Sequence, residues 1–499
     1  MTTFSRGPVR APRQASSREA SSRLGSSRQA SPRLAVELAV AADRDALLPL
    51  TGQLAAQLRD ALADGRLAAG ERLPSTRALA ATLGVSRTVV TVAYTQLFAE
   101  GWLEGRHGSG TYVAQGAAGP LPAATATAAP PQAPWVQPDP VPAVNLCPGI
   151  PWQAGIDQAA WRRAWRHAGT EPVPAQADPR GRGALREALT GYLRRSRGVC
   201  ATADQILVTR GVSAGLGLVA SALLRPGDGV GVEEPGYQAA RAVFASRGAR
   251  LVPCRVDRDG LVVDELPDGL RLVYTTPAHQ YPLGGRLPVP RRQALAAWAR
   301  ATGALIVEDD YDGEFRYDVA PLPTLFGLDP DLVIYLGTTS KTLTPALGAG
   351  WLVARRDLIP VLAAAAAELG ERVSGAVQHA VTELLASGEM ERHVRRMRHE
   401  YARRRAAMVA ALNGLTGDTA GMHMVLELPP GLAAAVAAAA SERGVEVATL
   451  DRYFAGPPAR EGLVLGYGAA DLAAVSRGCQ VIAEILAGVP GARGAGAPR

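Results

Sequence analysis

Residues 145–490 alternate short apolar runs with longer stretches of helical periodicity, and this alternation restricts the fold more than any other feature of the sequence. Runs such as QILVT, LIVED and VIYLG have the length of strands and are separated by helical segments. A mostly parallel sheet covered by helices produces this order, because a crossover helix must carry the chain back before each parallel strand. We therefore predict an α/β domain with a smaller α+β part toward its C-terminal end.

Polar or aromatic side chains follow four of these strand-like runs in succession. Tyr237 ends GVGVEEPGY, just past its strand-like part, an aromatic and polar stretch follows RLVYT, carboxylates follow ALIVED, and Lys341 follows LVIYLG. Ligands of such sheets bind beyond the carboxyl ends of the strands. One such strand end is typical of any solvated loop, but four in succession indicate a shared binding site.

Lys341, in GTTSKTLTPALGAG, is the only lysine of the chain, since arginine supplies the remaining 52 of the 53 basic Lys and Arg residues. Arginine stays protonated at any relevant pH, whereas a lysine amine can lose its proton and form an imine with an aldehyde. The alternative is the chance survival of one surface lysine. The apolar strand before it and the Ser/Thr-rich segment around it favour a Schiff base at Lys341 with an aldehyde cofactor.

A ring aldehyde held on Lys341 needs three kinds of support. Asp309 is our choice to pair with a protonated ring nitrogen, Tyr311 to hydrogen-bond the ring oxygen, and Tyr237 to cover the ring. Backbone amides at a helix start and nearby hydroxyls would bind a phosphate group. The candidates for that role are Val212, Ser213, Ala214, Thr338 and Ser340. Taken singly, Asp309 is equally compatible with a loop acid, and the two tyrosines with core aromatics.

Residues 47–114 have a different character and predict a winged helix-turn-helix domain. Leu54, Leu58 and Leu62 recur at helical spacing in the first segment. Next, Ser75 or Thr76 is suited to begin a short helix that ends at Gly84. Two short strands around a glycine-rich turn, GWLEGRHGSGTYV, then predict the wing.

The second helix of this predicted pair would begin after the cap residue Ser86. Its inner stripe would consist of Val89, Ala93 and Leu97, and its outer face would carry Arg87, Thr91, Tyr94 and Thr95. Such an outer face fits the major groove of double-stranded DNA, where Arg reads guanine edges. A helix-turn-helix used only for protein packing is the alternative.

The remaining segments lack a core of their own. We expect a disordered Ser/Arg-rich tail at residues 1–46, an Ala/Pro-rich linker at 115–144 and a disordered tail at 491–499. A net charge of +7 permits contact with nucleic acid. The four cysteines show no metal or disulfide spacing, so we expect no metal site and a reducing compartment. Without an apolar run of spanning length or a secretory signal, we predict a cytoplasmic protein that does not enter a membrane.

The segment LPSTRALAATLGVSRTVVTVAYTQLFAEGWLEGRHGSGTYV resembles the winged-helix head of GntR-type bacterial regulators over its whole length. The resemblance implies DNA contacts from both helices and the wing. The implied residues are Arg77, Ser86, Arg87, Thr88, Thr91, His107 and Gly108. Many members carry a further arginine where this sequence has Thr91, which implies a different base preference.

The larger half resembles fold-type-I aminotransferases that bind pyridoxal 5'-phosphate (PLP), and more closely the effector domain of the MocR subfamily of GntR regulators. EEPGY, TPAHQYPLGG, EDDYDGEF, SKTLTPALGAGWL and ERHVRRMRHEYARRR carry this resemblance, which runs from about residue 48 to 485. It implies a Schiff base on Lys341, pairing of Asp309 with the pyridine nitrogen and of Tyr311 with the phenolic oxygen, and stacking by Tyr237. Tyr281, in TPAHQYPLGG, is also assigned to the cofactor.

Two positions depart from the family pattern. The subfamily usually has an arginine near the phosphate seven residues after the lysine, where this sequence has Gly348. Fold-type-I enzymes hold the substrate carboxylate with an arginine in a context such as LRLGFA, where LVLGYG places Val464. Both changes weaken the expectation of efficient transamination more than that of cofactor binding, because the imine-forming amine remains.

We therefore predict a transcriptional regulator that binds operator DNA, PLP and an amino-compound effector. The resemblance also implies a homodimer in which each head crosses to the partner's body. The alternatives are a working PLP-dependent aminotransferase with a DNA-binding head, and a regulator that senses PLP itself.

Overall fold

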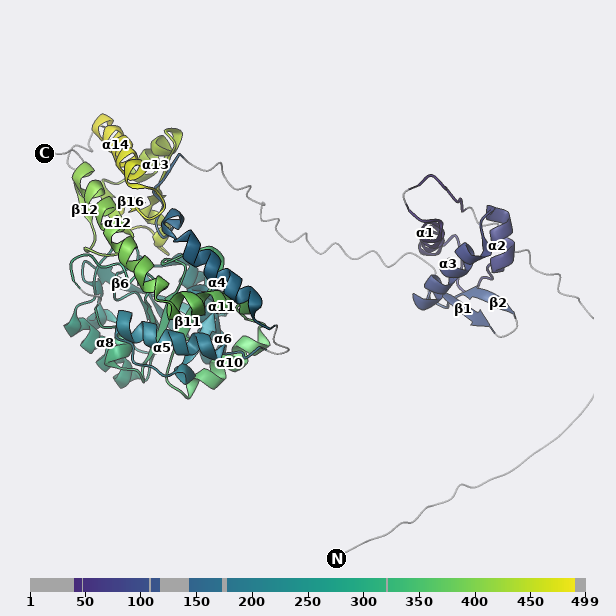
Figure 1. The fold of residues 1–499 in the computed structure, drawn as a ribbon, viewed down its shortest axis with the longest axis horizontal. Helices are drawn as coiled ribbons and strands as arrows, with labels where there is room; N and C mark the ends of the chain where they lie inside the picture. Colours follow the sequence, from purple (N-terminus) through teal and green to yellow (C-terminus); the bar gives the residue numbers. More distant parts are fainter. Residues whose placement is uncertain are drawn as a thin grey trace, which may run out of the picture. The chain divides into compact units, whose positions relative to one another are not determined.

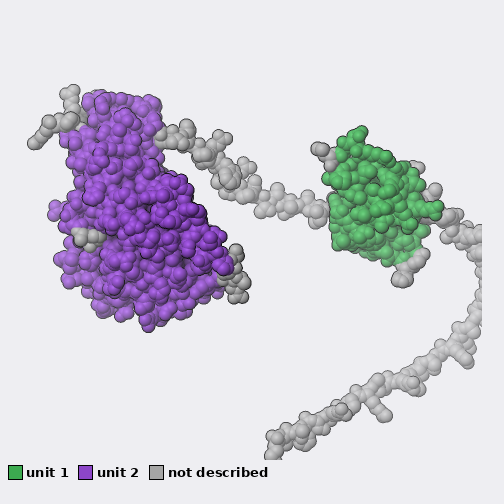
Figure 2. Space-filling view, in the orientation of Figure 1, with its two compact units in different colours: residues 1–135 green, residues 136–499 purple. Residues whose placement is uncertain are grey.

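The computed structural model describes residues 40–46, 48–106, 109–116, 143–172, 177–319 and 322–489. The chain divides into two compact units, residues 1–135 and 136–499, which Figure 2 colours separately. Each unit has a hydrophobic core of its own. The expected tail 1–46 and linker 115–144 lie mostly outside the described residues, and the tail 491–499 lies wholly outside them.

The described part of the first unit contains three helices followed by a two-stranded antiparallel hairpin (Figure 1). These elements are α1 (Leu50–Ala63), α2 (Thr76–Leu83), α3 (Arg87–Ala99), β1 (Leu103–Arg106) and β2 (Gly110–Val113). In β1 and β2, Leu103 lies opposite Val113 and Arg106 opposite Gly110. The predicted winged helix-turn-helix is therefore confirmed.

Side-chain caps and one glycine set the turn between α2 and α3. The Ser75 hydroxyl accepts from the amide of Ala78, and the Ser86 hydroxyl accepts from the amide of Val89. Gly84 ends α2 in the left-handed conformation, with φ of 62°, which residues with a side chain adopt only at a cost. The sequence pattern had predicted these helix ends.

The inner stripe of α3 differs from the prediction. Val90, Ala93, Tyr94 and Leu97 are buried, whereas Val89 is only half-buried. Tyr94, expected on the outer face, is 2% exposed, and its hydroxyl donates to the carbonyl of Pro74 at 2.9 Å. The expectation failed because a phenol can join a core while its hydroxyl bonds to backbone, so aromatic residues do not mark a polar face.

The second unit is built on an eight-stranded sheet in the order β4-β11-β10-β9-β8-β5-β6-β7. Its strands are β4 (Ile206–Thr209), β5 (Gly229–Glu234), β6 (Arg250–Asp257), β7 (Gly260–Leu261), β8 (Leu270–Thr275), β9 (Leu305–Asp309), β10 (Val333–Thr338) and β11 (Gly350–Val353). Strands β10, β9, β8, β5 and β6 are parallel, while β11 is antiparallel to both β10 and β4. The predicted, mostly parallel α/β sheet is confirmed.

Side chains of successive strand residues belong to two different hydrophobic clusters, so both faces of the sheet are covered. Val333 and Tyr335 of β10 pack with α5 (Gly183–Arg197) and α8 (Val289–Thr302). Ile334 and Leu336 pack with helices of the opposite face. The helices of the second face are α6 (Val212–Leu223), α7 (Gln238–Ser246) and α10 (Leu358–Glu368). This alternation explains why the strands appear in the sequence as continuous apolar runs.

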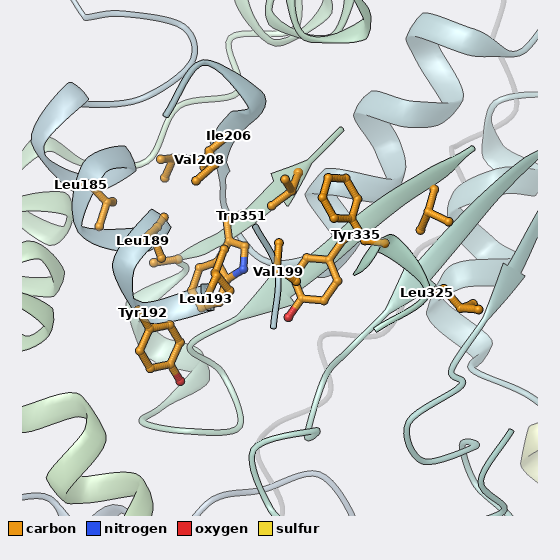
Figure 3. Close-up of a cluster of buried hydrophobic side chains, with 14 of the residues drawn as sticks. Leu185, Leu189, Tyr192, Leu193, Val199, Ile206, Val208, Leu325, Tyr335 and Trp351 are labelled. Atoms are coloured by element: carbon orange, nitrogen blue, oxygen red, sulfur yellow. The ribbon is translucent and has the colours of Figure 1, made fainter. Parts of the chain in front are cut away.

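Trp351 of β11 lies at the centre of the first of these clusters. Figure 3 shows its indole beside the α5 leucines Leu189 and Leu193, with Tyr335 on the sheet nearby. The Trp351 ring meets that of Tyr192 edge to face, with centroids 6.2 Å apart. Helices α4 (Gln158–Thr170) and α11 (Gly375–Ala386) extend the same cluster.

A smaller α+β part forms one end of the second unit, away from α5 and α8 in Figure 1. Its antiparallel sheet has the order β12-β13-β16-β15, and β14 pairs separately with β3. The elements are β3 (Val144–Asn145), α12 (Glu389–Ala411), β12 (Leu415–Thr416), β13 (His423–Leu428), α13 (Ala433–Glu442), β14 (Val445–Glu446), β15 (Ala448–Thr449), β16 (Glu461–Gly466) and α14 (Leu472–Gly488). No helix in the described ranges combines the length and the apolarity needed to cross a bilayer.

Candidate functional site

A cavity of about 370 Å³ opens at the carboxyl edge of the large sheet. Its lining comes from the loops after β4, β5, β8, β9 and β10 and from the segment after β3. The lining residues are Pro148, Gly149, Arg210, Gly211, Val212, Ser213, Tyr237, Tyr274, Thr276, Tyr281, Asp309, Tyr311, Thr338, Ser340, Lys341 and Pro345. The structure thus brings together every predicted cofactor residue except Ala214, which lies in the first turn of α6 but does not line the cavity.

Lys341 follows β10, and its amine lies inside the cavity. Its Nζ donates to the carbonyl of Gly149 at 2.7 Å. Burial lowers the pKa of this amine, which increases the fraction in the neutral, nucleophilic form. Gly149 has φ of 81°, and a Cβ there would approach Nζ to 2.9 Å, so glycine leaves the amine room.

Asp309 ends β9 and is fully buried within the lining. Its Oδ2 accepts from the hydroxyl of Tyr274 at 2.6 Å, whereas its Oδ1 has no hydrogen-bond partner among the described residues. Burial raises the pKa of this carboxyl to about 7. A buried carboxyl oxygen without a donor carries a desolvation penalty, so this atom is suited to accept from a ligand N–H.

The amino end of α6 meets two hydroxyl side chains from the loop after β10. The Oγ of Thr338 donates to that of Ser340 at 2.9 Å and accepts from the Ser340 amide at 3.0 Å. Gly211 precedes the helix with φ of 103°, and a Cβ built on it would still lie 3.8 Å from the Thr338 hydroxyl. Free amides and hydroxyls around open space make this end of the cavity suitable for an anionic phosphate.

Aromatic side chains form one wall of the cavity. Tyr237 and Tyr281 meet edge to face at 5.9 Å, and Tyr281 packs similarly against Tyr311 at 5.5 Å. The Tyr281 hydroxyl donates to that of Tyr453 in the smaller α+β part, at 3.2 Å. These rings give a flat ligand an apolar surface to pack against.

Tyr311 has its hydroxyl at the inner end of this wall. The hydroxyl donates to the backbone carbonyl of His279 at 3.0 Å, and it lies 3.0 Å from the Nδ1 of the same histidine. Burial and the neighbouring Asp312 raise the pKa of Tyr311 well above its usual value, so the phenol keeps its proton and acts as a donor.

The two positions that depart from the family pattern have different surroundings. Gly348 has φ of 53° and ends the short turn Pro345–Leu347, and a Cβ there would meet no atom within 4 Å. Val464 of β16 is fully buried in an apolar cluster with Val425, Leu450 and Tyr453, against which Tyr281 packs. No cation stands at position 464, and the cationic residues in the lining are Arg210 and Lys341.

The candidate DNA-contacting residues lie around the start of α3. Arg77, Ser86, Arg87, Thr88 and Thr91 are all exposed. The Nε of Arg87 donates to the Thr76 hydroxyl at 3.3 Å, and the Thr91 hydroxyl donates to the Arg87 carbonyl at 2.9 Å. His107 and Gly108 lie outside the described residues, between β1 and β2.

Sequence reasoning missed several residues that line the cavity. Arg210, Tyr274, Thr276 and Gly149 belong to the lining. Arg210 and Thr276 directly follow β4 and β8, so the rule that identified the other strand ends also applied to them. Tyr274 and Gly149 had no such signal, because one lies inside a strand and the other comes from a segment distant in sequence.

Two family profiles together match most of the chain. Residues 50–113 match "Bacterial regulatory proteins, gntR family", and residues 143–454 match "Aminotransferase class I and II". Among solved structures, LysN, an alpha-aminoadipate aminotransferase from Thermus thermophilus complexed with N-(5'-phosphopyridoxyl)-L-leucine, is 26% identical with a TM-score of 0.63. The likeness covers 69% of this chain and 92% of LysN. The fold and the cavity thus define a winged-helix DNA-binding regulator joined to an aminotransferase-like body.

Relatives with the same two-part organisation extend over nearly the whole chain. The HTH-type pyridoxine biosynthesis transcriptional regulator PdxR of Corynebacterium glutamicum is 37% identical over 450 residues, covering 88% of this chain and 96% of the relative. The probable rhizopine catabolism regulatory protein MocR of Rhizobium meliloti is 36% identical over 458 residues, covering 86% and 92%. The chain therefore belongs to the MocR subfamily of GntR-type transcriptional regulators.

Proposed function

We propose that this regulator binds PLP covalently on Lys341 and that PLP itself is the signal that changes its affinity for operator DNA. One observation carries the choice of signal. Position 464, where an arginine would hold the carboxylate of an amino acid, is a valine buried in an apolar cluster. Position 464 therefore offers no cation to the carboxylate of an amino acid that enters beside the cofactor, and a desolvated carboxylate without a charged partner is unfavourable.

The lining fits PLP at each of its functional groups. The Lys341 amine matches the aldehyde, and the unpartnered Oδ1 of Asp309 matches a protonated ring nitrogen. Tyr311 can donate to the ring oxygen, and Tyr237 can cover the ring. When bound, PLP supplies an aldehyde that an amine can capture and a ring that withdraws electrons.

The phosphate end supports binding without the arginine that the family usually has at position 348. The amides of Val212 and Ser213 at the start of α6, with the hydroxyls of Thr338 and Ser340, would bind the phosphate oxygens. Arg210 lines the same end and would supply positive charge. Because its guanidinium also pairs with Glu371 at 2.6 Å, we expect a weaker hold on the phosphate than from an uncommitted arginine. Weaker binding suits a reversible sensor.

The name of one relative supports PLP as the signal. The Corynebacterium relative is named as a regulator of pyridoxine biosynthesis, and pyridoxine is chemically a precursor of the PLP ring. We propose that the protein acts as a homodimer in the cytoplasm, where operator DNA is found. We further propose that the head of each protomer crosses to its partner's body.

The direct test measures the affinity for operator DNA as PLP is added, with no amino compound present. A DNA fragment selected by the protein from a random pool is titrated at fixed salt, with and without PLP, and binding is followed by fluorescence anisotropy. We expect the affinity to change at least about fivefold, which is a coupling free energy of about 1 kcal/mol. If PLP forms its absorbance band on the protein but the DNA affinity stays unchanged, PLP is refuted as the signal.

An amino compound added to the PLP-loaded protein is the second candidate signal. Lys341 lines a cavity of about 370 Å³, and the Rhizobium relative is named for rhizopine catabolism. If DNA affinity responds only when an amine accompanies PLP, this candidate replaces the first. Sustained turnover of amino acid and 2-oxo acid would instead identify a working aminotransferase.

Replacing Arg87 with alanine should weaken binding to the selected operator by about 1–3 kcal/mol, because one guanidinium at the start of α3 is positioned to read a base edge. The measurement is DNA affinity at fixed salt on the selected operator and on a scrambled sequence. Arg66→Ala is the matched control, since Arg66 is an exposed arginine of the same unit that lies outside α2 and α3. Equal losses for both variants, or none for Arg87→Ala, would contradict the assignment.

The affinity for PLP should rise with pH between about 6 and 8. Asp309 has a pKa of about 7, so below this pH it is mostly protonated and neutral, and above it the carboxylate can pair with a protonated ring nitrogen. Asp309→Asn should bind PLP more weakly and lose the part of the pH dependence centred near 7. An unchanged pH profile in that variant would show that another group controls binding.

A further inference from the structure

A buried hydrogen-bonded chain extends from Tyr311 away from the cavity. The Tyr311 hydroxyl lies 3.0 Å from the Nδ1 of His279, and the same nitrogen lies 2.9 Å from the Oδ2 of Asp312. The side chains of His279 and Asp312 are each only 1% exposed. Two groups therefore compete for one ring nitrogen in a place without bulk water.

The Asp312 carboxylate decides which imidazole nitrogen of His279 carries the hydrogen. A carboxylate oxygen can only accept, so Asp312 is satisfied when the hydrogen of the imidazole is on Nδ1. A protonated Nδ1 has no lone pair for Tyr311. The tyrosine hydroxyl must then donate elsewhere, to the His279 carbonyl or to an acceptor in the cavity.

We propose that His279 and Asp312 are positioning residues that keep the Tyr311 hydroxyl available as a donor to the ring oxygen of PLP. This inference rests on the proposed function, because it requires PLP in the cavity. Among the described residues Nε2 has no hydrogen-bond partner in either tautomer, so the bond made at Nδ1 decides between them. Without the carboxylate, Nδ1 loses its acceptor and the imidazole hydrogen can move to Nε2. Nδ1 would then accept from Tyr311 and withdraw its hydroxyl from the cofactor.

The groups around this chain come from four parts of the fold. They are Asp309 at the end of β9 and Asp312 after it, His279 and Tyr281 after β8, Lys341 after β10, and His423 at the start of β13. His423 lies 4.9 Å from His279 between ring centroids, and its Nε2 donates to the Pro282 carbonyl at 2.9 Å. Burial lowers the pKa of His423 to about 3, so this imidazole stays neutral at working pH.

The test is a pH titration of the absorbance band of protein-bound PLP. The band changes as the nitrogen that joins Lys341 to the cofactor loses its proton. Loss of this proton leaves the negative charge on the ring oxygen uncompensated. A hydrogen bond from Tyr311 to that oxygen stabilises the charge and so favours loss of the proton. Removing the bond should therefore raise the pH midpoint of the absorbance change. We expect Tyr311→Phe to raise the midpoint by about one pH unit, a tenfold change.

Asp312→Asn, which is nearly isosteric, should raise the midpoint in the same direction by a smaller amount. Asp312→Ala, which removes the acceptor altogether, should approach the effect of Tyr311→Phe. In the Tyr311→Phe background, neither Asp312 variant should add a further shift, because the donor is already absent. His379→Gln on α11 is the matched control and should leave the midpoint unchanged, since this histidine contacts Glu171 outside the site.

The outcomes separate this inference from the proposed function. If the unaltered protein forms no bound band, PLP binding itself is refuted. If the band forms but its midpoint is unaffected by Tyr311→Phe or by both Asp312 variants, PLP binding survives and the positioning role is overturned. An Asp312 shift that persists in the Tyr311→Phe background would also overturn it, because Asp312 would then act by its charge rather than through Tyr311.

Discussion

Lys341→Ala should abolish covalent binding of PLP completely. The variant incubated with PLP should show the spectrum of the free aldehyde, and treatment with borohydride should attach no cofactor to the protein. The physical reason is the absence of another lysine in the chain, so no neighbouring side-chain amine can replace the lost one. Peptide mapping of the reduced, unaltered protein should place the modification on Lys341.

Lys341→Arg is the matched variant for this experiment. It keeps the positive charge and most of the side-chain volume, but a guanidinium does not form the imine. Both variants should retain operator binding through the first unit, which has its own hydrophobic core. A PLP adduct that survives in Lys341→Ala would refute Lys341 as the attachment site, and the account of the cavity would fail with it.

Arg197→Met should destabilise the second unit by about 3–5 kcal/mol, because it removes one partner of a buried ion pair and leaves the other charge uncompensated. Arg197 of α5 donates to Asp310 through Nη2 at 2.7 Å and to the Gly313 carbonyl at 2.8 Å. Both side chains of the pair are at most 1% exposed. Urea unfolding, followed by the tryptophan fluorescence of the unit, measures the loss.

This ion pair also bears on the cavity, since Asp310 is adjacent to Asp309 and its charge raises the pKa of Asp309. Without Arg197, the carboxyl of Asp309 should be harder to ionise, and PLP should bind more weakly near pH 7. Arg255→Met is the control, because Arg255 makes a comparable two-bond contact with Glu265 but both side chains are at least half exposed. That variant should lose about 1 kcal/mol or less. Equal losses in the two variants would contradict the role of burial.

The sequence predicted the parts of the site that follow strands. Asp309 ends an apolar run, Tyr311 and Lys341 follow such runs within a few residues, and the carboxyl ends of parallel strands meet at one edge of a sheet. Once the runs were identified as parallel strands, the convergence of these side chains followed. The caps Ser75 and Ser86 were predictable for a similar reason, because capping depends on residues within three positions of each other.

The helix face of α3 shows where such local reasoning failed. Tyr94 and Val90, rather than Val89, complete the buried stripe, because the choice between adjacent positions depends on the angle at which α1 and α2 pack against α3. Periodicity establishes that a helix has an apolar side but leaves its rotation uncertain by one position. The bond from Tyr94 to Pro74 joins residues 20 positions apart and has no local signature.

By itself, the sequence determined the class of this protein: a winged-helix head, a mostly parallel α/β body and a single amine suited to an aldehyde. These features depend on residue type and short spacing, which a sequence states directly. Only the tertiary structure decided which groups surround that amine. The Gly149 carbonyl is 192 positions along the chain from Lys341, and the Tyr274 hydroxyl is 35 positions from Asp309. Val464 lies in a buried apolar cluster formed by segments that meet only after folding. Hydrogen bonding and burial depend on distance in space, and distance along the chain does not encode it.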